Sequence, residues 1–187
     1  MSGRASAAVI GPVVARQRFA VLAARFNEAI SEKLLDGALA AFATHGVPRS
    51  AVDVHWVPGS FELPQAGMAL ARTGRYAGIV CVGAVIKGET PHWDYVASAA
   101  AQGIARAALD SGVPMSFGVI TALTTEQAWA RAGGAVGNRG QEAALAALEM
   151  AAWLHALGEA RRDRSEGKET RGHRGERRDR RSRARAR

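Results

Sequence analysis

One stretch of the chain gathers more groups able to do chemistry than any other. It runs from Gly83 to Asp94 and reads GAVIKGETPHWD. Glu89 and Thr90 come just before a predicted helix, where backbone N–H groups, the Thr90 hydroxyl and the helix dipole suit a phosphate. His92 can exchange protons near neutral pH. The simpler alternative is that Thr90 caps the helix and that His92 is merely exposed.

Three further loops carry rings and charges. Phe26 and Phe61 each follow a predicted strand, where an exposed ring either stacks on a flat heterocycle or packs against another subunit. Glu62 lies at a helix start and is either a carboxylate favoured by the dipole or an acceptor for hydroxyl and ring N–H groups. Arg131, at the end of a short predicted helix, is either solvated or a phosphate ligand. The second role requires the fold or a neighbouring subunit to bring it to Glu89.

Well-known catalytic motifs are absent from the sequence. No strand is followed by a spaced-glycine dinucleotide fingerprint, a Walker loop or a nucleophile elbow. No Cys/His cluster has zinc spacing, so no metal is expected. Lys87 could form a Schiff base, but its neighbours give no sign of the desolvated pocket that such a lysine needs.

Alternating strands and helices must position these loops. Asn27 is predicted to cap the first helix and Gly46 to end it. The pattern predicts strands over 19–23, 51–57, 76–82 and 114–121, and further helices over 63–73, 94–110, 124–131 and 138–157. This alternation predicts an α/β domain whose parallel sheet has helices on both faces. Ligands of such sheets bind beyond the carboxyl ends of the strands, which is where the candidate loops lie.

Charge divides the chain into a neutral body and a basic end. Of 25 Lys and Arg residues, 13 lie in residues 161–187, together with 5 of the 17 acidic residues, so the rest is balanced. We therefore expect an N-terminal arm (1–17), one domain (18–158) and a disordered Arg-rich tail (159–187). The tail is either simply solvated or an arm that binds nucleic acid weakly, with strong salt dependence.

Composition excludes other classes of protein. A single cysteine, Cys81, rules out an internal disulfide. No apolar run reaches the roughly 18–20 residues that span a bilayer, and no secretory signal is recognisable. The expectation is a reduced, cytoplasmic location without membrane attachment. Aromatic residues make up only 6% of the chain, which disfavours a stacking platform for single-stranded nucleic acid.

Taken together, the loops strongly resemble the lumazine synthase (6,7-dimethyl-8-ribityllumazine synthase) family. The motifs follow the family order over about residues 18–155, and the matching segments are 24–27, 56–64, 83–95, 117–121 and 126–140. The resemblance implies the penultimate step of riboflavin biosynthesis: 5-amino-6-(D-ribitylamino)uracil condenses with 3,4-dihydroxy-2-butanone 4-phosphate to give 6,7-dimethyl-8-ribityllumazine. It also implies a single-domain, flavodoxin-like three-layer sandwich with a four-stranded sheet, and no metal or organic cofactor.

The resemblance assigns a role to each candidate residue. His92 matches the family's proton donor. The positions that match those holding the uracil substrate are Phe26, Ser60, Phe61, Glu62, Ala84, Val85, Ile86 and Phe117. The positions that match those binding the butanone phosphate are Glu89, Thr90 and Arg131. In the family, the residues at positions 117 and 131 reach the site from the adjacent subunit.

The resemblance further implies a homo-oligomer of at least five subunits with active sites at the interfaces. Pentamers, decamers and sixty-subunit capsids all occur in the family; the short link 133–140 and the long N-terminal arm favour the capsid. Riboflavin synthase is a further candidate partner. Lys87 stands where many members have Arg, which disfavours a Schiff base, and the tail has no counterpart. The competing class is a binding or scaffold protein that carries a flavin precursor without converting it.

Overall fold

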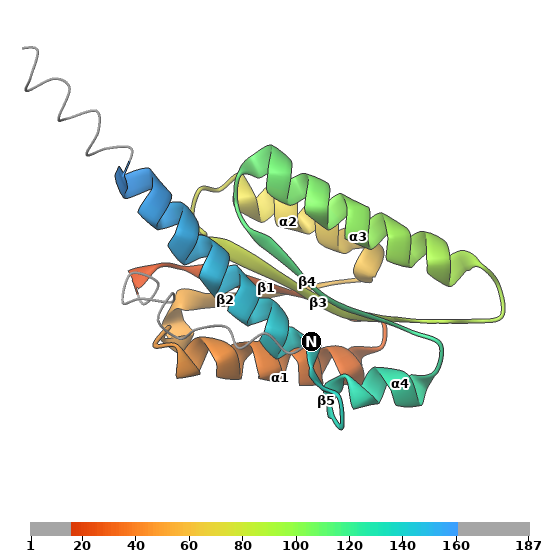
Figure 1. Ribbon diagram of the computed structural model, residues 1–187. Helices are drawn as coiled ribbons and strands as arrows, with labels where there is room; N and C mark the ends of the chain where they lie inside the picture. Colours follow the sequence, from red (N-terminus) through yellow and green to blue (C-terminus); the bar gives the residue numbers. More distant parts are fainter. Residues whose placement is uncertain (1–15, 161–187) are drawn as a thin grey trace, which may run out of the picture. The chain divides into compact units, whose positions relative to one another are not determined.

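The computed structural model describes residues 16–160 and contains a four-stranded parallel sheet. Its strands are β1 (Phe19–Ala24), β2 (Val52–Val57), β3 (Gly78–Ile86) and β4 (Met115–Ala122), in the order β2-β1-β3-β4 (Figure 1). The chain adds β2 on one side of β1 and then crosses to add β3 on the other. The carboxyl ends of β1 and β3 therefore form the switch point of the sheet, where ligands of such folds bind. The predicted flavodoxin-like α/β fold is confirmed.

Helices cover both faces of the sheet. On one face lie α1 (Glu28–Thr44), α4 (Thr125–Ala130) and the helical residues 139–152; on the other lie α2 (Leu63–Ala71) and α3 (His92–Ser111) (Figure 1). This first compact unit ends at Ala152, and residues 153–160 of the second unit are also helical. Among the described helices, none is long and apolar enough to cross a membrane.

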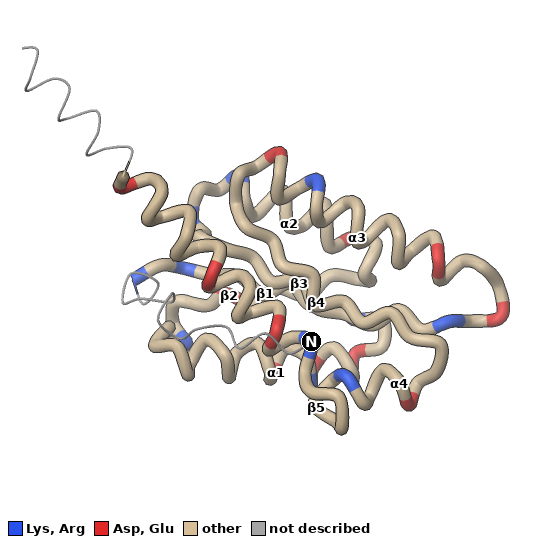
Figure 2. The backbone as a smooth tube through the Cα atoms, viewed as in Figure 1, with Lys and Arg blue, Asp and Glu red and all other residues tan. Residues whose placement is uncertain are grey.

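The strand sequences explain why the sheet is covered twice. All six residues of β1 are buried, and they alternate between two cores. Phe19 and Val21 pack in the core under α1, whereas Ala20 and Leu22 pack in the core under α2 and α3. Figure 2 shows the charged residues mainly on helices and loops, and β1, β3 and β4 carry none. A continuous apolar run is what a parallel sheet buried on both faces requires.

A polar cluster ties the amino ends of three strands together. Asp53, in β2, accepts hydrogen bonds from Arg18 (2.7 Å), Arg75 (3.4 Å) and the Tyr76 hydroxyl (2.7 Å). The Tyr76 hydrogen bond, followed by the Arg18 hydrogen bond, holds the pKa of Asp53 below its ordinary value of 3.8. Burial and the Asp53 carboxylate raise the pKa of Tyr76. The cluster therefore favours an ionised Asp53 in the folded protein.

Two predicted helix starts are confirmed in detail. The Thr124 side chain accepts a hydrogen bond from the Gln127 N–H (3.3 Å), while Gln127 Oε1 accepts one from the Leu123 N–H (3.0 Å). Asn138 Oδ1 accepts from the N–H groups of Gly140 and Gln141 at 2.9 and 3.1 Å. Both arrangements satisfy helix N–H groups that have no partner within the helix.

Other details of the helix and strand ends were predicted wrongly. Asn27 is the N-cap residue of α1, and its carbonyl accepts from the N–H groups of Ile30 and Ser31, but its side chain makes no capping hydrogen bond and its backbone is left-handed (φ 62°). Strand β3 does not stop at Val82 but continues through Gly83 to Ile86. The strand is buried, and the missing side chain of Gly83 makes room for Ser60, which lies close to it. Helix α3 starts at His92, two residues earlier than predicted.

A short hairpin and the chain ends complete the comparison with the sequence. Strands β5 (Ala132–Gly134) and β6 (Gly137–Asn138) form an antiparallel hairpin that the sequence analysis missed. Short 3₁₀ turns, η2 (Arg49–Ala51) and η3 (Ser60–Glu62), precede β2 and α2. Residues 159 and 160 are helical, although the predicted tail begins at residue 159. The rest of the predicted tail and nearly all of the predicted arm lie outside the described residues.

Candidate active site

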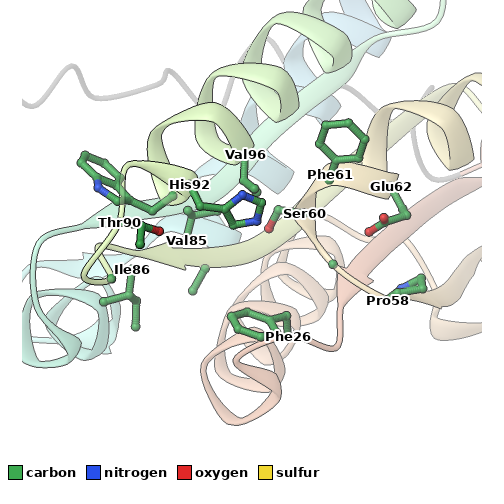
Figure 3. A pocket seen from close by; sticks show the side chains of 14 residues that line it. Phe26, Pro58, Ser60, Phe61, Glu62, Val85, Ile86, Thr90, His92 and Val96 are labelled. Carbon is green, nitrogen blue, oxygen red and sulfur yellow. The ribbon is translucent and has the colours of Figure 1, made fainter.

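A pocket of about 440 Å³ opens at the carboxyl edge of the sheet, beside the switch point (Figure 3). The residues that line it follow β1 and β2, end β3 and begin α3: Phe26, Pro58, Gly59, Ser60, Phe61, Glu62, Ala84, Val85, Ile86, Gly88, Thr90, His92, Trp93 and Val96. Most of this lining is apolar, and a few polar side chains enter it. That combination is typical of a site for a small, partly flat ligand.

Phe26 comes directly after β1, and its backbone is held by β2. The Arg25 N–H donates to the carbonyl of Val57 (2.8 Å), and the Phe26 N–H donates to that of Pro58 (3.0 Å). These bonds prolong the β1–β2 pairing past the strand ends. Phe26 is 72% exposed beside the pocket. It is therefore free to offer one face to a flat ring.

The turn η3 places three candidate residues together. Ser60 is only 4% exposed, and a β-carbon on Gly83 would lie 2.8 Å from its hydroxyl oxygen. A β-carbon on Gly59 would lie 3.2 Å from Glu62 Oε2 and 4.0 Å from the Phe26 β-carbon. Because Gly59 and Gly83 have no side chains, there is space for Ser60 beside Gly83 and for Glu62 and Phe26 beside Gly59. Glu62 also precedes α2, where the dipole favours a carboxylate.

The end of β3 offers backbone groups to the pocket. The β1–β3 pairing stops at Ala23 opposite Val82, whereas the β3–β4 pairing continues to Ile86 opposite Ala122. Beyond Val82, β3 therefore has a strand neighbour on one side only. Because successive residues of a strand point their backbone groups to opposite sides, Ala84 and Ile86 face the side without a strand. Asn27 Nδ2 donates to the Ala84 carbonyl (2.8 Å).

Thr90 and His92 lie where α3 begins. His92 is the first residue of this 20-residue helix, and its exposed imidazole projects into the pocket, near Ser60 and Val96 in Figure 3. No side chain among the described residues caps α3, so the alternative in which Thr90 is a helix cap is wrong. The Thr90 hydroxyl and the helix start both face the pocket region, and together they suit an anion.

Three predicted site residues do not line this pocket. Glu89 is exposed in the loop between two lining residues. Phe117 lies in the middle of β4, opposite Cys81, and is 43% exposed. Arg131 follows α4 and donates to the Gln127 carbonyl (3.0 Å). The chain by itself therefore brings together His92 and most of the expected uracil site, but not Phe117 or Arg131.

The structure adds residues that the sequence analysis did not select. Trp93 and Val96 line the pocket from the first turns of α3. A neighbouring hollow of about 310 Å³ shares Phe61, Glu62, His92 and Val96 and adds Tyr95. Helical spacing was the available signal, since Val96 follows His92 by four residues and so shares its face.

Nucleophilic chemistry through Cys81 or Lys87 finds little support in the described part of the chain. Burial raises the pKa of the Cys81 thiol to about 12, so a thiolate nucleophile is disfavoured. Lys87 is exposed, and therefore lacks the desolvation that activates a Schiff-base lysine. Between residues 16 and 160, no group of three or more His, Cys, Asp or Glu side chains is arranged to hold a metal ion.

Fold and pocket together define a flavodoxin-like α/β protein with a pocket at the switch point of its sheet. A sequence model of the 6,7-dimethyl-8-ribityllumazine synthase family matches residues 16–155, and the chain belongs to this family. Members of the family are enzymes of riboflavin biosynthesis that form a lumazine. The resemblance seen in the loop motifs is thereby confirmed.

Proposed function

We propose that this protein condenses 5-amino-6-(D-ribitylamino)uracil with 3,4-dihydroxy-2-butanone 4-phosphate to give 6,7-dimethyl-8-ribityllumazine, phosphate and water. The observation that carries the proposal is the convergence of Phe26, Glu62 and His92 on one pocket, together with the family match over residues 16–155. A ring to stack on, an acceptor for hydroxyl groups and a group that moves protons are what this condensation needs.

The uracil substrate occupies the part of the pocket between Phe26 and η3. Phe26 stacks on the pyrimidine ring, and Ser60 and Phe61 hold its edge. Glu62 accepts a hydrogen bond from a ribityl hydroxyl. A hydrogen bond to a carboxylate is stronger than one to a neutral acceptor. The Ala84 N–H and the backbone of Ile86 face the side of β3 without a strand, and with the Val85 side chain they complete this half of the site.

The ketone phosphate lies at the start of α3. Its phosphate takes hydrogen bonds from main-chain N–H groups around Glu89 and Thr90 and from the Thr90 hydroxyl, and the dipole of α3 favours its negative charge. Arg131 of a neighbouring subunit adds a guanidinium, which can bind a phosphate through two N–H groups.

His92 moves the protons of the reaction. The free amine of the uracil attacks the ketone, and loss of water leaves an imine. Elimination of phosphate follows, and the ribitylamino nitrogen then closes the second ring with loss of water. Each step transfers a proton to or from nitrogen or oxygen, which a neutral imidazole and its protonated form can do near pH 7. Holding two substrates in contact supplies much of the remaining acceleration.

The site is shared between subunits in this proposal. Phe117 and Arg131 lie away from their own chain's pocket, which is consistent with their serving a neighbour's pocket. An assembly of at least five subunits follows, and we favour the sixty-subunit capsid. Riboflavin synthase, which would use the product, remains a candidate partner. Any weak binding of nucleic acid is assigned to the Arg-rich tail.

Binding and turnover together test this function against a carrier. Trp93 lines the pocket, so its fluorescence should change when the uracil binds. The purified protein should bind the uracil with a signal that the variant Phe26→Ala weakens, and should form lumazine once the ketone phosphate is added. Binding without any lumazine would identify a carrier instead.

A further inference from the structure

We propose that Asn27 is a positioning residue: it fixes Phe26 against the end of β3 so that the ring stands ready to stack on the uracil. This inference rests on the proposed function, because it assigns one more residue to the same site. Asn27 does not line the pocket itself, so it acts through Phe26 and Ala84, which do.

The Asn27 side chain joins segments that are far apart in sequence. Its Nδ2 donates to the Ala84 carbonyl at 2.8 Å, across 57 positions. This bond lies where the β1–β3 pairing has already ended. The Lys87 N–H donates to the Ala122 carbonyl in β4, so Ala84, three residues earlier, has its carbonyl on the opposite side. The amide of Asn27 therefore supplies the partner that a longer β1 would have supplied.

Phe26 is consequently held from two directions. On one side its N–H donates to the Pro58 carbonyl, and on the other its neighbour Asn27 is bound to β3. Between these anchors the backbone has little freedom, and the Phe26 side chain lines the pocket (Figure 3). A ring fixed before the substrate arrives loses less conformational freedom on binding.

Asparagine meets two requirements at once. Its backbone is left-handed (φ 62°, ψ 45°), and no other non-glycine residue between 16 and 160 has a positive φ. Asn tolerates this conformation better than most side chains, and its amide can donate to a carbonyl. Aspartate would keep the backbone preference but could only accept when ionised, and glycine would keep the freedom but lose the amide.

The chain offers a matched control for the amide bond. Asn138 Nδ2 also donates to a main-chain carbonyl, that of Lys33, at the same 2.8 Å, yet it lies outside the pocket. The variants Asn27→Asp and Asn138→Asp therefore remove the same kind of donor, in one case bound to the pocket-lining residue Ala84 and in the other bound to Lys33, away from the pocket. Asn27→Asp should raise the KM for the uracil about tenfold, with a smaller change in kcat, whereas Asn138→Asp should change it less than about twofold.

A double variant tests whether Asn27 acts through Phe26. In the unsubstituted protein, Asn27→Gly should raise the uracil KM several-fold. In the Phe26→Ala variant, the same substitution should raise the KM by less than about twofold further, because no ring is left to position. If the fold-change in KM of the double variant equals the product of the fold-changes of the two single variants, the inference is overturned. A fall in thermal stability of Asn27→Asp without any change in KM would also overturn it, since that is the mark of a purely structural residue.

A crystal structure of Asn27→Asp separates this inference from the proposed function. The Phe26 ring should be displaced or present in more than one position, relative to the unsubstituted protein. If the unsubstituted protein forms no lumazine but the ring moves, the proposed function fails and the positioning role stands. An unmoved ring overturns the positioning role, whatever the activity.

Discussion

Gly83 of β3 lies against the hydroxyl of Ser60, so closely that a β-carbon on Gly83 would stand 2.8 Å from Ser60 Oγ and 3.0 Å from the Ala24 β-carbon. Three strands meet at this point: β1 ends at Ala24, Ser60 follows the end of β2, and Gly83 lies within β3. Because Gly83 has no side chain, the buried hydroxyl of Ser60 can lie directly against it.

We expect Gly83→Ala to damage both stability and substrate binding. The added methyl group must displace Ser60 or Ala24, and overpacking of this kind costs about 1–3 kcal/mol of the free energy of unfolding. The uracil KM should rise as well, because η3 moves. Denaturant unfolding and steady-state kinetics measure the two effects. Gly88→Ala is the control for stability, since nothing lies within 4 Å of its added β-carbon; equal losses in both variants would refute the steric account.

The strands and the site loops could largely be predicted from the sequence, because unbroken apolar runs such as β1 reflect burial on both faces. The end of β3 could not. Gly83 reads as a strand terminator when its neighbours in space are unknown, whereas its actual role is to make room for Ser60. Asn27 was misread for a similar reason: its partner, the Ala84 carbonyl, is 57 residues away.

The hairpin β5–β6 shows a second limit. Its strands contain three and two residues, too few for a periodic pattern, and Gly133 and Gly137 suggest only turns. Trp93 escaped notice because a single aromatic residue next to His92 has no distinguishing signal until α3 is known to start at His92. Patterns of neighbouring residues in the sequence predict helices and strands well, but the contacts between those helices and strands become visible only in the structure.

Loss of the His92 imidazole should slow the chemistry more than the binding. His92→Ala should lower kcat by roughly 10–10⁴-fold, because general acid–base catalysis contributes about that much, while the affinity for the uracil changes little. Rapid-quench turnover and equilibrium titration separate the two quantities. His55→Ala, which replaces an exposed histidine of β2, should leave kcat unchanged. An unaltered kcat with lost uracil affinity would assign His92 a binding role instead.

Arg131 should act on one substrate and from another subunit. Arg131→Ala should raise the KM for the ketone phosphate far more than that for the uracil, since only the ketone carries a phosphate. Assemblies reconstituted from Arg131→Ala and His92→Ala subunits should regain part of the activity, because some interfaces then combine an intact Arg131 with an intact His92. Mixed assemblies no more active than either parent would show that each chain builds its own site.

Acid should weaken the fold partly through Asp53. Its pKa is lowered in the folded state, so the ionised form contributes stability that is present above the unfolded pKa, near 4, and is lost as the pH falls through the lower, folded pKa. Asp53→Asn should cost about 1–3 kcal/mol at pH 7 and flatten the acid limb of the stability curve. Asp110→Asn, which breaks an exposed pair with Arg106, should cost less than about 1 kcal/mol.

Removal of residues 161–187 should leave catalysis intact. The remaining 160 residues carry balanced charge, and the tail composition offers little apolar surface for packing. The truncated protein should form lumazine at the same rate and assemble to the same size by light scattering. Binding of non-specific RNA should disappear with the tail, and in the full chain it should weaken steeply with salt. Retained RNA affinity would place the nucleic-acid site on the body.

Simultaneous measurement of lumazine and free phosphate tests the central claim most directly. The purified full chain is mixed with both substrates, and both products are followed in the same sample, with omission of each substrate in turn and with a protein-free reaction alongside. The account predicts that the two products appear in equal amounts, that both substrates are required, and that His92→Ala abolishes most of the excess over the protein-free rate. Lumazine formed no faster than without protein, or phosphate released without lumazine, would contradict it.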